Sequence, residues 1–335
     1  MHVRSIILTL IAVLLARQAF PSAELFLPIP RSGRRSVRYF ADHDLKQRDP
    51  KAEYAVVMVH GVDGGCSDCT PRLREIIKGH PQHDKVFFIA PCFPIPSMLN
   101  ETEKRKIVYW EENRWQAGND SLVADKLSPY DVLDLIFKSL NDVRLYPNLR
   151  HVLFCGYSAG GQIVSRYMAV SGIKARKGLA VDFAAGAPST WLFLNENAMW
   201  HCGLANRNRY ASRVSNKDIF KNIEKRFMLC FCGTADVDTK DLSVGPQAMA
   251  QGATRIERFT NFRKHIATFK KLKGAFTFVE VEGVGHSFQC WDSIGIDKLI
   301  LGERGAIGTN SPSRGGSSDK TPRHRSGKDG EKAKE

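Results

Sequence analysis

Six short apolar runs, separated by segments with helical periodicity, constrain the fold of this chain more than any other feature. They are rich in Val, Phe and Ala and lie at 55–59, 86–90, 152–155, 178–185, 227–232 and 276–281. Mostly continuous apolar strands are typical of a sheet that is buried on both faces. Strands that alternate with helices along a chain form a mostly parallel sheet with helices packed on both of its faces. The sequence therefore predicts an α/β fold.

Helical patterns fill the intervals between these runs. Residues 130–140 place apolar side chains on one side of a helix, and Ser128-Pro129 supplies a capping residue and a first helical position. Further helices are predicted over 71–79, 160–170 and 256–273. No internal repeat is visible, so we expect a single folded domain.

The two ends of the chain differ from this body. Arg4 precedes an apolar run over 5–16, and Ala23 is a small residue at which a secretory signal peptide, residues 1–23, would be cleaved. An uncleaved membrane anchor is the alternative, although the run is short for a bilayer span. Residues 302–335 are rich in Gly, Ser, Lys and Arg and cannot bury enough apolar surface to fold. We expect a folded domain over 24–301, a disordered basic tail, and a location in the secretory pathway or outside the cell.

Composition and charge exclude a wholly disordered chain, a collagen and a polytopic membrane protein. Hydrophobic residues make up 43% and charged residues 25% of the 335 residues, which is ordinary for a globular protein. The net charge of +14 is spread thinly, and the densest basic segments, 263–264 and 270–273, are expected on a solvated helix face. We therefore expect no nucleic-acid partner and no stable membrane insertion after cleavage of the signal.

Eight cysteines fit an oxidising compartment. Three of them lie in apolar runs and are expected to be buried free thiols, namely Cys155, Cys230 and Cys232. The better disulfide candidates lie in loop-like segments, and their pairing does not follow from the sequence: Cys66, Cys69, Cys92, Cys202 and Cys290.

Cys66 and Cys69 also stand before His80 and His83 in a spacing that resembles a zinc finger. Pro81 interrupts the histidine pair and the middle spacing is short, so we expect the two cysteines to form or join disulfides and expect no metal. Asn100 and Asn119 stand in acceptor motifs for glycosylation.

A Gly-x-Ser-x-Gly motif, 156–160, joins the third apolar run to the helical pattern after it. A nucleophile raised on a sharp turn between strand and helix needs small neighbours two residues to either side, so that strand and helix can approach each other. The motif alone is a weak signal, but it directly follows a strand and precedes a helix, as that geometry requires. Ser158 is therefore the predicted nucleophile.

A serine hydroxyl becomes a good nucleophile when a histidine takes its proton and a carboxylate holds that histidine in one tautomer. Residues 283–286 form a tight turn after the last apolar run, so His286 is the predicted base. Two other histidines compete. His265 is assigned to a solvated, Lys-rich helix face, and His201 lies in an insertion where it could line a pocket.

The predicted acid is Asp236 rather than Asp238. Both follow the fifth apolar run, and open α/β sheets hold their sites at the carboxyl ends of strands. The small residues 233–235 form a tight turn that places Asp236 at the end of the strand. Asp238 begins the loop beyond, where an acid more often caps a helix.

A negatively charged intermediate needs backbone N–H donors. The segment 60–65 follows the first strong strand and offers such groups, so Val62 is a predicted donor of an oxyanion hole, with Ala159 as the second donor. His60 is expected to hold this loop by hydrogen bonding rather than to act as a base. Asp63 could contact substrate or cap the next helix, and the two roles stay open.

These motifs resemble those of serine α/β-hydrolases, in particular a group of largely uncharacterised secreted hydrolases of fungi, bacteria and protists. The resemblance extends over about 36–295, and the matching segments are 38–40, 60–63, 109–110, 115–118, 156–162, 166–167, 187–194, 251–252, Arg255 and 283–286. It implies the α/β-hydrolase fold, with Ser158 as nucleophile, Asp236 as acid, His286 as base and Val62 as oxyanion donor. Tyr157 stands where that group more often carries His.

The insertion after Gly186 carries Trp191 and further aromatic and amide residues. Such residues in a loop beside a site could contact substrate or form the insertion's own small core, and both readings stay open. Asp63, Tyr157 and Trp191 are the candidate substrate contacts.

We expect hydrolysis of a small-molecule or polymer ester through an acyl-enzyme, without a cofactor. A peptidase, thioesterase or acyltransferase on the same triad is the alternative, and a non-enzymatic binding protein on a hydrolase scaffold is another.

Overall fold

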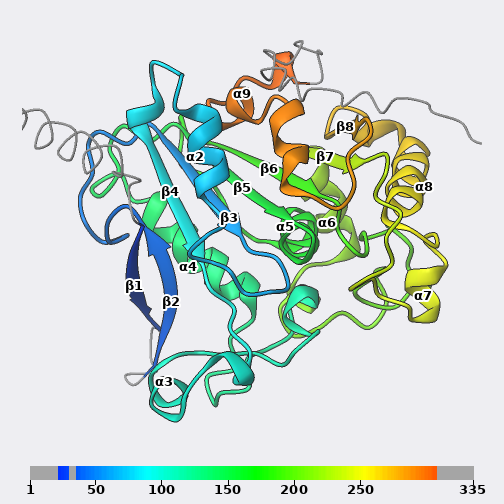
Figure 1. Cartoon of the computed structure of the whole chain (residues 1–335), viewed down its shortest axis with the longest axis horizontal. Coiled ribbons are helices and arrows are strands. Elements are labelled where there is room, and N and C mark those ends of the chain that lie inside the picture. Colours follow the sequence, from blue (N-terminus) through cyan, green and yellow to red (C-terminus); the bar gives the residue numbers. More distant parts are fainter. Residues whose placement is uncertain (1–21, 30–34, 308–335) are drawn as a thin grey trace, which may run out of the picture.

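The computed structural model describes residues 22–29 and 35–307 and is built around an eight-stranded sheet (Figure 1). The order of the strands across the sheet is β1-β2-β4-β3-β5-β6-β7-β8. Their bounds are Ala23–Pro28 (β1), Ser36–Ala41 (β2), Tyr54–Val59 (β3), Val86–Pro91 (β4), His151–Tyr157 (β5), Ala180–Gly186 (β6), Phe227–Gly233 (β7) and Phe276–Val281 (β8). Strands β3 to β8 are parallel, and β1 and β2 form an antiparallel edge. The predicted mostly parallel sheet is confirmed.

Helices cover both faces of this sheet. Their bounds are Pro71–Ile77 (α2), Glu101–Lys106 (α3), Pro129–Leu140 (α4), Ala159–Val170 (α5), Asn216–Glu224 (α6), Pro246–Met249 (α7), Arg255–Ala267 (α8) and Ile296–Ile300 (α9). In Figure 1, α2 lies in front of the sheet and α4 behind it. Helix α9 packs against α2, whereas α5 packs against α4 and α6.

The connections that leave β3 and β5 run in opposite directions across the sheet. From β3 the chain passes through α2 to β4 on one side, and from β5 it passes through α5 to β6 on the other. Because crossovers between parallel strands are right-handed, α2 and α5 lie on opposite faces. Open α/β sheets bind ligands at the carboxyl ends of the strands where the order reverses. In this chain that point lies between β3 and β5.

Helix boundaries follow local signals where the sequence carries them. Helix α4 begins as predicted, because the Ser128 side chain accepts from Tyr130 N–H while Asp131 accepts from Ser128 N–H. The helix predicted over 256–273 ends earlier, at Ala267, because the chain then turns through a short 3-10 segment that buries Leu272 before β8.

The folded body extends beyond the predicted boundary at residue 301. The Arg304 guanidinium donates through Nε to Oδ2 of the buried Asp182 at 2.9 Å, and His151 Nε2 lies 3.0 Å from the same oxygen. The predicted signal cleavage point, Ala23, is the first residue of β1. Residues 1–21 and 308–335, which carry most of the predicted signal and tail, lie outside the described residues. None of the helices in the described part is long and apolar enough to cross a membrane.

One disulfide joins Cys66 to Cys92, with the Cα atoms 5.4 Å apart. The prediction of buried free thiols is confirmed for Cys155, Cys230 and Cys232. The expectation that the loop cysteines form disulfides is confirmed for Cys66 and Cys92. It is wrong for three others, because each is buried and unpaired: Cys69, Cys202 and Cys290. Since Cys66 is bonded to Cys92, it has no thiolate to offer to zinc.

Candidate active site

Ser158 lies on a strained turn between β5 and α5. Its backbone has φ 55° and ψ −116°, a positive φ that is uncommon for a residue with a side chain. Its N–H donates to the Gly186 carbonyl at 2.8 Å, which fixes the turn against β6. Ser158 therefore stands at the carboxyl end of β5, beside the point where the strand order reverses.

The two motif glycines are required because backbone atoms occupy the space of a side chain. A Cβ on Gly156 would lie 2.4 Å from the carbonyl carbon of Gly160, and a Cβ on Gly160 would lie 2.1 Å from the Val59 oxygen. The first contact closes the turn, and the second brings the start of α5 onto the end of β3. This is the steric reason for small neighbours that the sequence predicted.

Asp236 and His286 lie on the loops that follow β7 and β8. Gly233 pairs with Val281 in the sheet, so both loops leave the same edge, and Ala235 N–H donates to the Val284 carbonyl at 3.0 Å. His286 Nδ1 lies 2.7 Å from Asp236 Oδ2. A carboxylate only accepts, so Nδ1 carries the proton and Nε2 is left free to accept one. Asp236 is fully buried, whereas a quarter of the His286 side chain is exposed.

Tyr157 connects this pair to the Ser158 turn. Its ring centroid lies 5.0 Å from that of His286, and its hydroxyl accepts from the Ser287 N–H at 3.0 Å. The side chain is almost completely buried, and burial raises the pKa of its hydroxyl well above the usual value. Tyr157 thus packs against His286 and holds the loop that carries it. This position differs from the substrate contact expected of Tyr157.

The loop after β3 brings backbone N–H donors to the carboxyl ends of the strands, where Ser158 also lies. Val59 of β3 pairs with Gly156 of β5, so residue 62 and residue 159 each lie three positions beyond this pair of residues on neighbouring strands. Among the described residues, no hydrogen-bond acceptor is found for the N–H of Val62 or of Ala159. Two such donors beside a nucleophile can bind a developing oxyanion.

His60 holds this loop, as the sequence predicted. Phe93 N–H donates to its Nε2 at 2.9 Å, and its Nδ1 lies 2.6 Å from the Gly61 carbonyl. Burial lowers the pKa of His60 to about 4. An imidazole with both nitrogens engaged in this way is neutral and has no free nitrogen for catalysis.

Asp63 and Trp191 differ in their access to solvent. Asp63 is exposed, and it does not cap α2, because Thr70 holds the N-cap position. Trp191 is fully buried and stacks on Phe262 of α8 with ring centroids 4.6 Å apart. A fully buried ring offers no surface to a substrate, so the proposed contact at Trp191 is corrected to a role in the insertion's own core.

The two competing histidines take structural positions. His265 accepts from Leu194 N–H at 2.9 Å and packs on Phe193, so its prediction as a solvated surface residue is wrong. Burial lowers the pKa of His201 to about 3 and keeps its imidazole neutral. The His201 carbonyl accepts from the buried Arg166.

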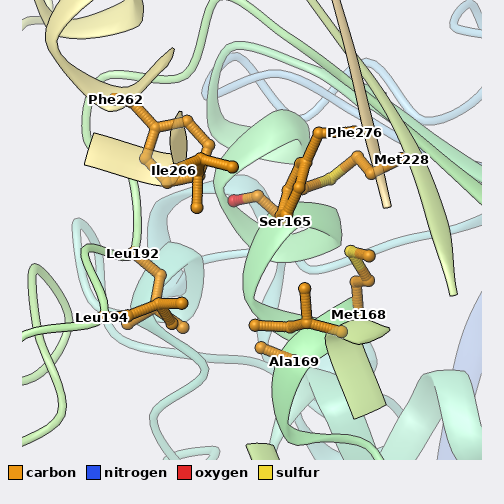
Figure 2. A pocket seen from close by; sticks show the side chains of 10 residues that line it. Ser165, Met168, Ala169, Leu192, Leu194, Met228, Phe262, Ile266 and Phe276 are labelled. Atoms are coloured by element: carbon orange, nitrogen blue, oxygen red, sulfur yellow. The ribbon is translucent and has the colours of Figure 1, made fainter. Parts of the chain in front are cut away.

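A small cavity lies under α5, away from the carboxyl edge of the sheet. Figure 2 shows apolar side chains around it, among them Met168, Leu192 and Phe262, together with the Ser165 hydroxyl. Its volume of about 10 Å³ is that of one water molecule at most. It is a packing gap between α5, α8 and the insertion, and no ester would fit into it.

The sequence did not predict a role for Arg255. The side chain is almost completely buried at the start of α8, and its Nη1 lies 3.7 Å from Asp236 Oδ1. In the sequence, Arg255 belongs only to the family resemblance. Its place in a helix pattern beside Ile256 and Arg258 carries no signal of contact with a loop almost twenty residues earlier.

Comparisons with known proteins agree on the fold. No model of a protein family matches the chain, and no curated protein matches it. Among solved structures, the poly(3-hydroxybutyrate) depolymerase of Bordetella parapertussis is similar, with 18% identity over 88% of this chain and 93% of that chain, at a TM-score of 0.60. The poly(aspartic acid) hydrolase-1 of Sphingomonas sp. KT-1 is also similar, with 14% identity over 79% of this chain and 93% of that chain, at a TM-score of 0.54. The strand order, the elbow and these similarities together show that the chain has the α/β-hydrolase fold.

Proposed function

We propose that this protein is a secreted serine hydrolase that cleaves carboxylic esters through an acyl-enzyme. The observation that carries the proposal is the 2.7 Å hydrogen bond between His286 Nδ1 and Asp236 Oδ2, at the sheet edge where Ser158 occupies its strained turn. A nucleophile without an oriented base would be an idle serine, whereas this histidine is held in the tautomer that a base needs.

In the proposed reaction, the Ser158 oxygen attacks the ester carbonyl while His286 Nε2 takes the hydroxyl proton. The N–H groups of Val62 and Ala159 bind the oxyanion. Asp236 stabilises the imidazolium, which then gives its proton to the leaving alcohol. Water attacks the acyl-serine with His286 again as base, and the released acid restores the serine.

Two observations support the proposal, one for an ester substrate and one for an extracellular site of action. One similar structure carries the name of a poly(3-hydroxybutyrate) depolymerase, which fits a polymer ester as substrate. The other carries the name of a poly(aspartic acid) hydrolase, and because poly(aspartic acid) is linked by amide bonds, that name bears on the peptidase alternative. The Cys66–Cys92 disulfide fits an oxidising compartment. The peptidase, thioesterase and acyltransferase alternatives use the same triad, and assays with amide, thioester and competing acceptor substrates separate them from an esterase.

The test is labelling with a fluorophosphonate probe, together with hydrolysis of short p-nitrophenyl esters. We expect the folded protein to gain one probe adduct at Ser158, and Ser158→Ala to lose both the adduct and turnover by thousands-fold or more. Ser139→Ala, on α4, is the control that keeps both. Esterase activity near the original level in Ser158→Ala would overturn the assignment, and a folded protein that takes no label would favour a binding role.

A further inference from the structure

The buried carboxylate of Asp236 uses only one of its two oxygens in hydrogen bonding. Oδ2 accepts from His286, whereas Oδ1 is buried and has no hydrogen-bond partner among the described residues. The nearest cation is the Arg255 guanidinium, with Nη1 3.7 Å from Oδ1. Burying an ionised carboxylate without a nearby positive charge is unfavourable, so the guanidinium of Arg255 stabilises the ionised form of Asp236.

Arg255 is held in place by the loop that follows Asp236. Its Nη1 donates to the Asp238 carbonyl at 2.9 Å and its Nη2 to the Lys240 carbonyl at 2.8 Å. The guanidinium thus fixes the course of residues 236–240 while its charge faces the carboxylate. Arg258, one turn further along α8, donates to the carbonyls of Gly252, Ser189 and Ser243 and pairs with no carboxylate in the described structure.

We propose that Arg255 is a positioning residue of the active site: it holds the Asp236 loop and supplies the fixed positive charge that balances the Asp236 carboxylate while His286 is neutral. This inference rests on the proposed function and deepens it. The Arg255, Asp236 and His286 cluster has no net charge when the imidazole is neutral. Protonation of His286 gives the cluster a buried positive charge, which the guanidinium opposes.

Other titratable groups face the pair, and burial keeps them neutral. Cys232 of β7 has its Sγ 3.9 Å from Asp236 Oδ2, and burial raises the pKa of this thiol. Burial also raises the pKa of Tyr157, from β5, and of Cys290, which follows the histidine loop. Arg255 is therefore the charged group whose removal changes the field at the pair.

The test is the pH profile of kcat/KM for Arg255→Met, Arg255→Gln and Arg255→Lys. Loss of the positive charge lets the Asp236–His286 pair keep its extra proton to higher pH, so the acidic limb should move upward by about one pH unit in the Met and Gln variants. Turnover should fall more than KM rises. Arg255→Lys keeps the charge and should leave the limb close to its original position.

Arg258→Met is the matched control, because it removes a buried guanidinium from the same helix without removing the charge beside Asp236. We expect it to lower stability and to leave the acidic limb in place. A purely structural role for Arg255 predicts an equal loss at every pH with an unmoved limb, and that result would overturn the proposal. An equal shift in Arg258→Met would overturn it as well.

A second measurement separates this proposal from the proposed function. In a Ser158→Ala background, the His286 imidazole is titrated by NMR with and without Arg255→Gln, so no assay of activity is needed. We expect His286 to hold its proton to higher pH when the charge at residue 255 is gone. An unchanged titration in the folded protein refutes the role of Arg255. Retained esterase activity in Ser158→Ala refutes the proposed function instead.

Discussion

Two histidines at the same edge of the sheet differ in whether their Nε2 atom has a hydrogen-bond partner, and this sets their roles. Phe93 N–H can only donate, so His60 Nε2 accepts and its proton stays on Nδ1, beside the Gly61 carbonyl. His286 also carries its proton on Nδ1, but the carboxylate of Asp236 accepts it and Nε2 has no partner in the described structure. Both nitrogens of His60 are used in hydrogen bonds that hold the loop, whereas Nε2 of His286 is available for proton transfer.

The choice between Asp236 and Asp238 is testable with a matched pair of variants. Asp236→Asn should lower kcat for a short ester by about four orders of magnitude, because an amide favours the wrong imidazole tautomer. Asp238 is exposed and accepts from Lys240 N–H, so Asp238→Asn should change kcat little. The measurement is steady-state hydrolysis of one p-nitrophenyl ester by both variants, and the reverse ranking would contradict the assignment.

The buried His60 predicts a loss of stability in mild acid. Its pKa is about 4 in the folded protein and about 6.5 in the unfolded chain. The unfolded chain therefore binds a proton that the folded protein rejects, and stability falls as the pH drops below about 6.5. Urea unfolding of the original protein and of His60→Gln should show their difference in free energy of unfolding shrinking by about 2 kcal/mol from pH 7 to pH 5.

The control for this measurement is His83→Gln, which changes an exposed histidine. Its free energy of unfolding should follow that of the original protein at each pH. Parallel curves for the original protein and His60→Gln would contradict a neutral, buried His60.

At the scale of elements, the sequence predicts best where a local pattern coincides with burial. Strand β5 and helix α5 were expected because an apolar run, the elbow and a helical pattern follow one another. Strand β2 alternates between buried and partly exposed positions, and β1 is mostly exposed at the sheet edge, so neither forms a continuous apolar run. The sequence does not indicate the end of α8, because the lysines of the segment 270–273 continue a helical pattern beyond Ala267.

The contact between α5 and β3 yields a prediction for the elbow. A Cβ at Gly160 would lie 2.1 Å from the Val59 carbonyl oxygen, and a backbone atom cannot rotate away. Gly160→Ala should therefore destabilise the protein by about 1–3 kcal/mol and lower turnover by displacing Ser158. Gly172, just beyond α5, has no atom within 4 Å of such a Cβ, so Gly172→Ala is the control. Thermal unfolding and ester hydrolysis of both variants decide the point, and equal effects would contradict it.

At the scale of the whole molecule, the site depends on contacts between distant segments. The Cys66–Cys92 disulfide and the bond from Phe93 to His60 both fasten the loop after β3 to the end of β4. The proposed order Ser158, Asp236, His286 follows from motifs at strand ends, which the sequence displays. The disulfide partner and the place of Arg255 did not, because they depend on which loops the assembled sheet brings together.

The contact between Arg304 and Asp182 gives a prediction about where the folded body ends. Asp182 is fully buried in β6, where it faces His151 and accepts from Arg304 at 2.9 Å. A chain ending at Leu301, the predicted domain boundary, loses that arginine and leaves the buried carboxylate one partner short. We expect it to be less stable by about 2 kcal/mol, a value below that of a fully buried pair because about half of the Arg304 side chain is exposed. A chain ending at Ile307 keeps the contact and should unfold at the urea concentration of the full chain. Equal urea midpoints for the two truncated chains would place the boundary of the folded domain at residue 301. A lower midpoint for the chain ending at Leu301 than for the chain ending at Ile307 would extend the folded domain to Arg304.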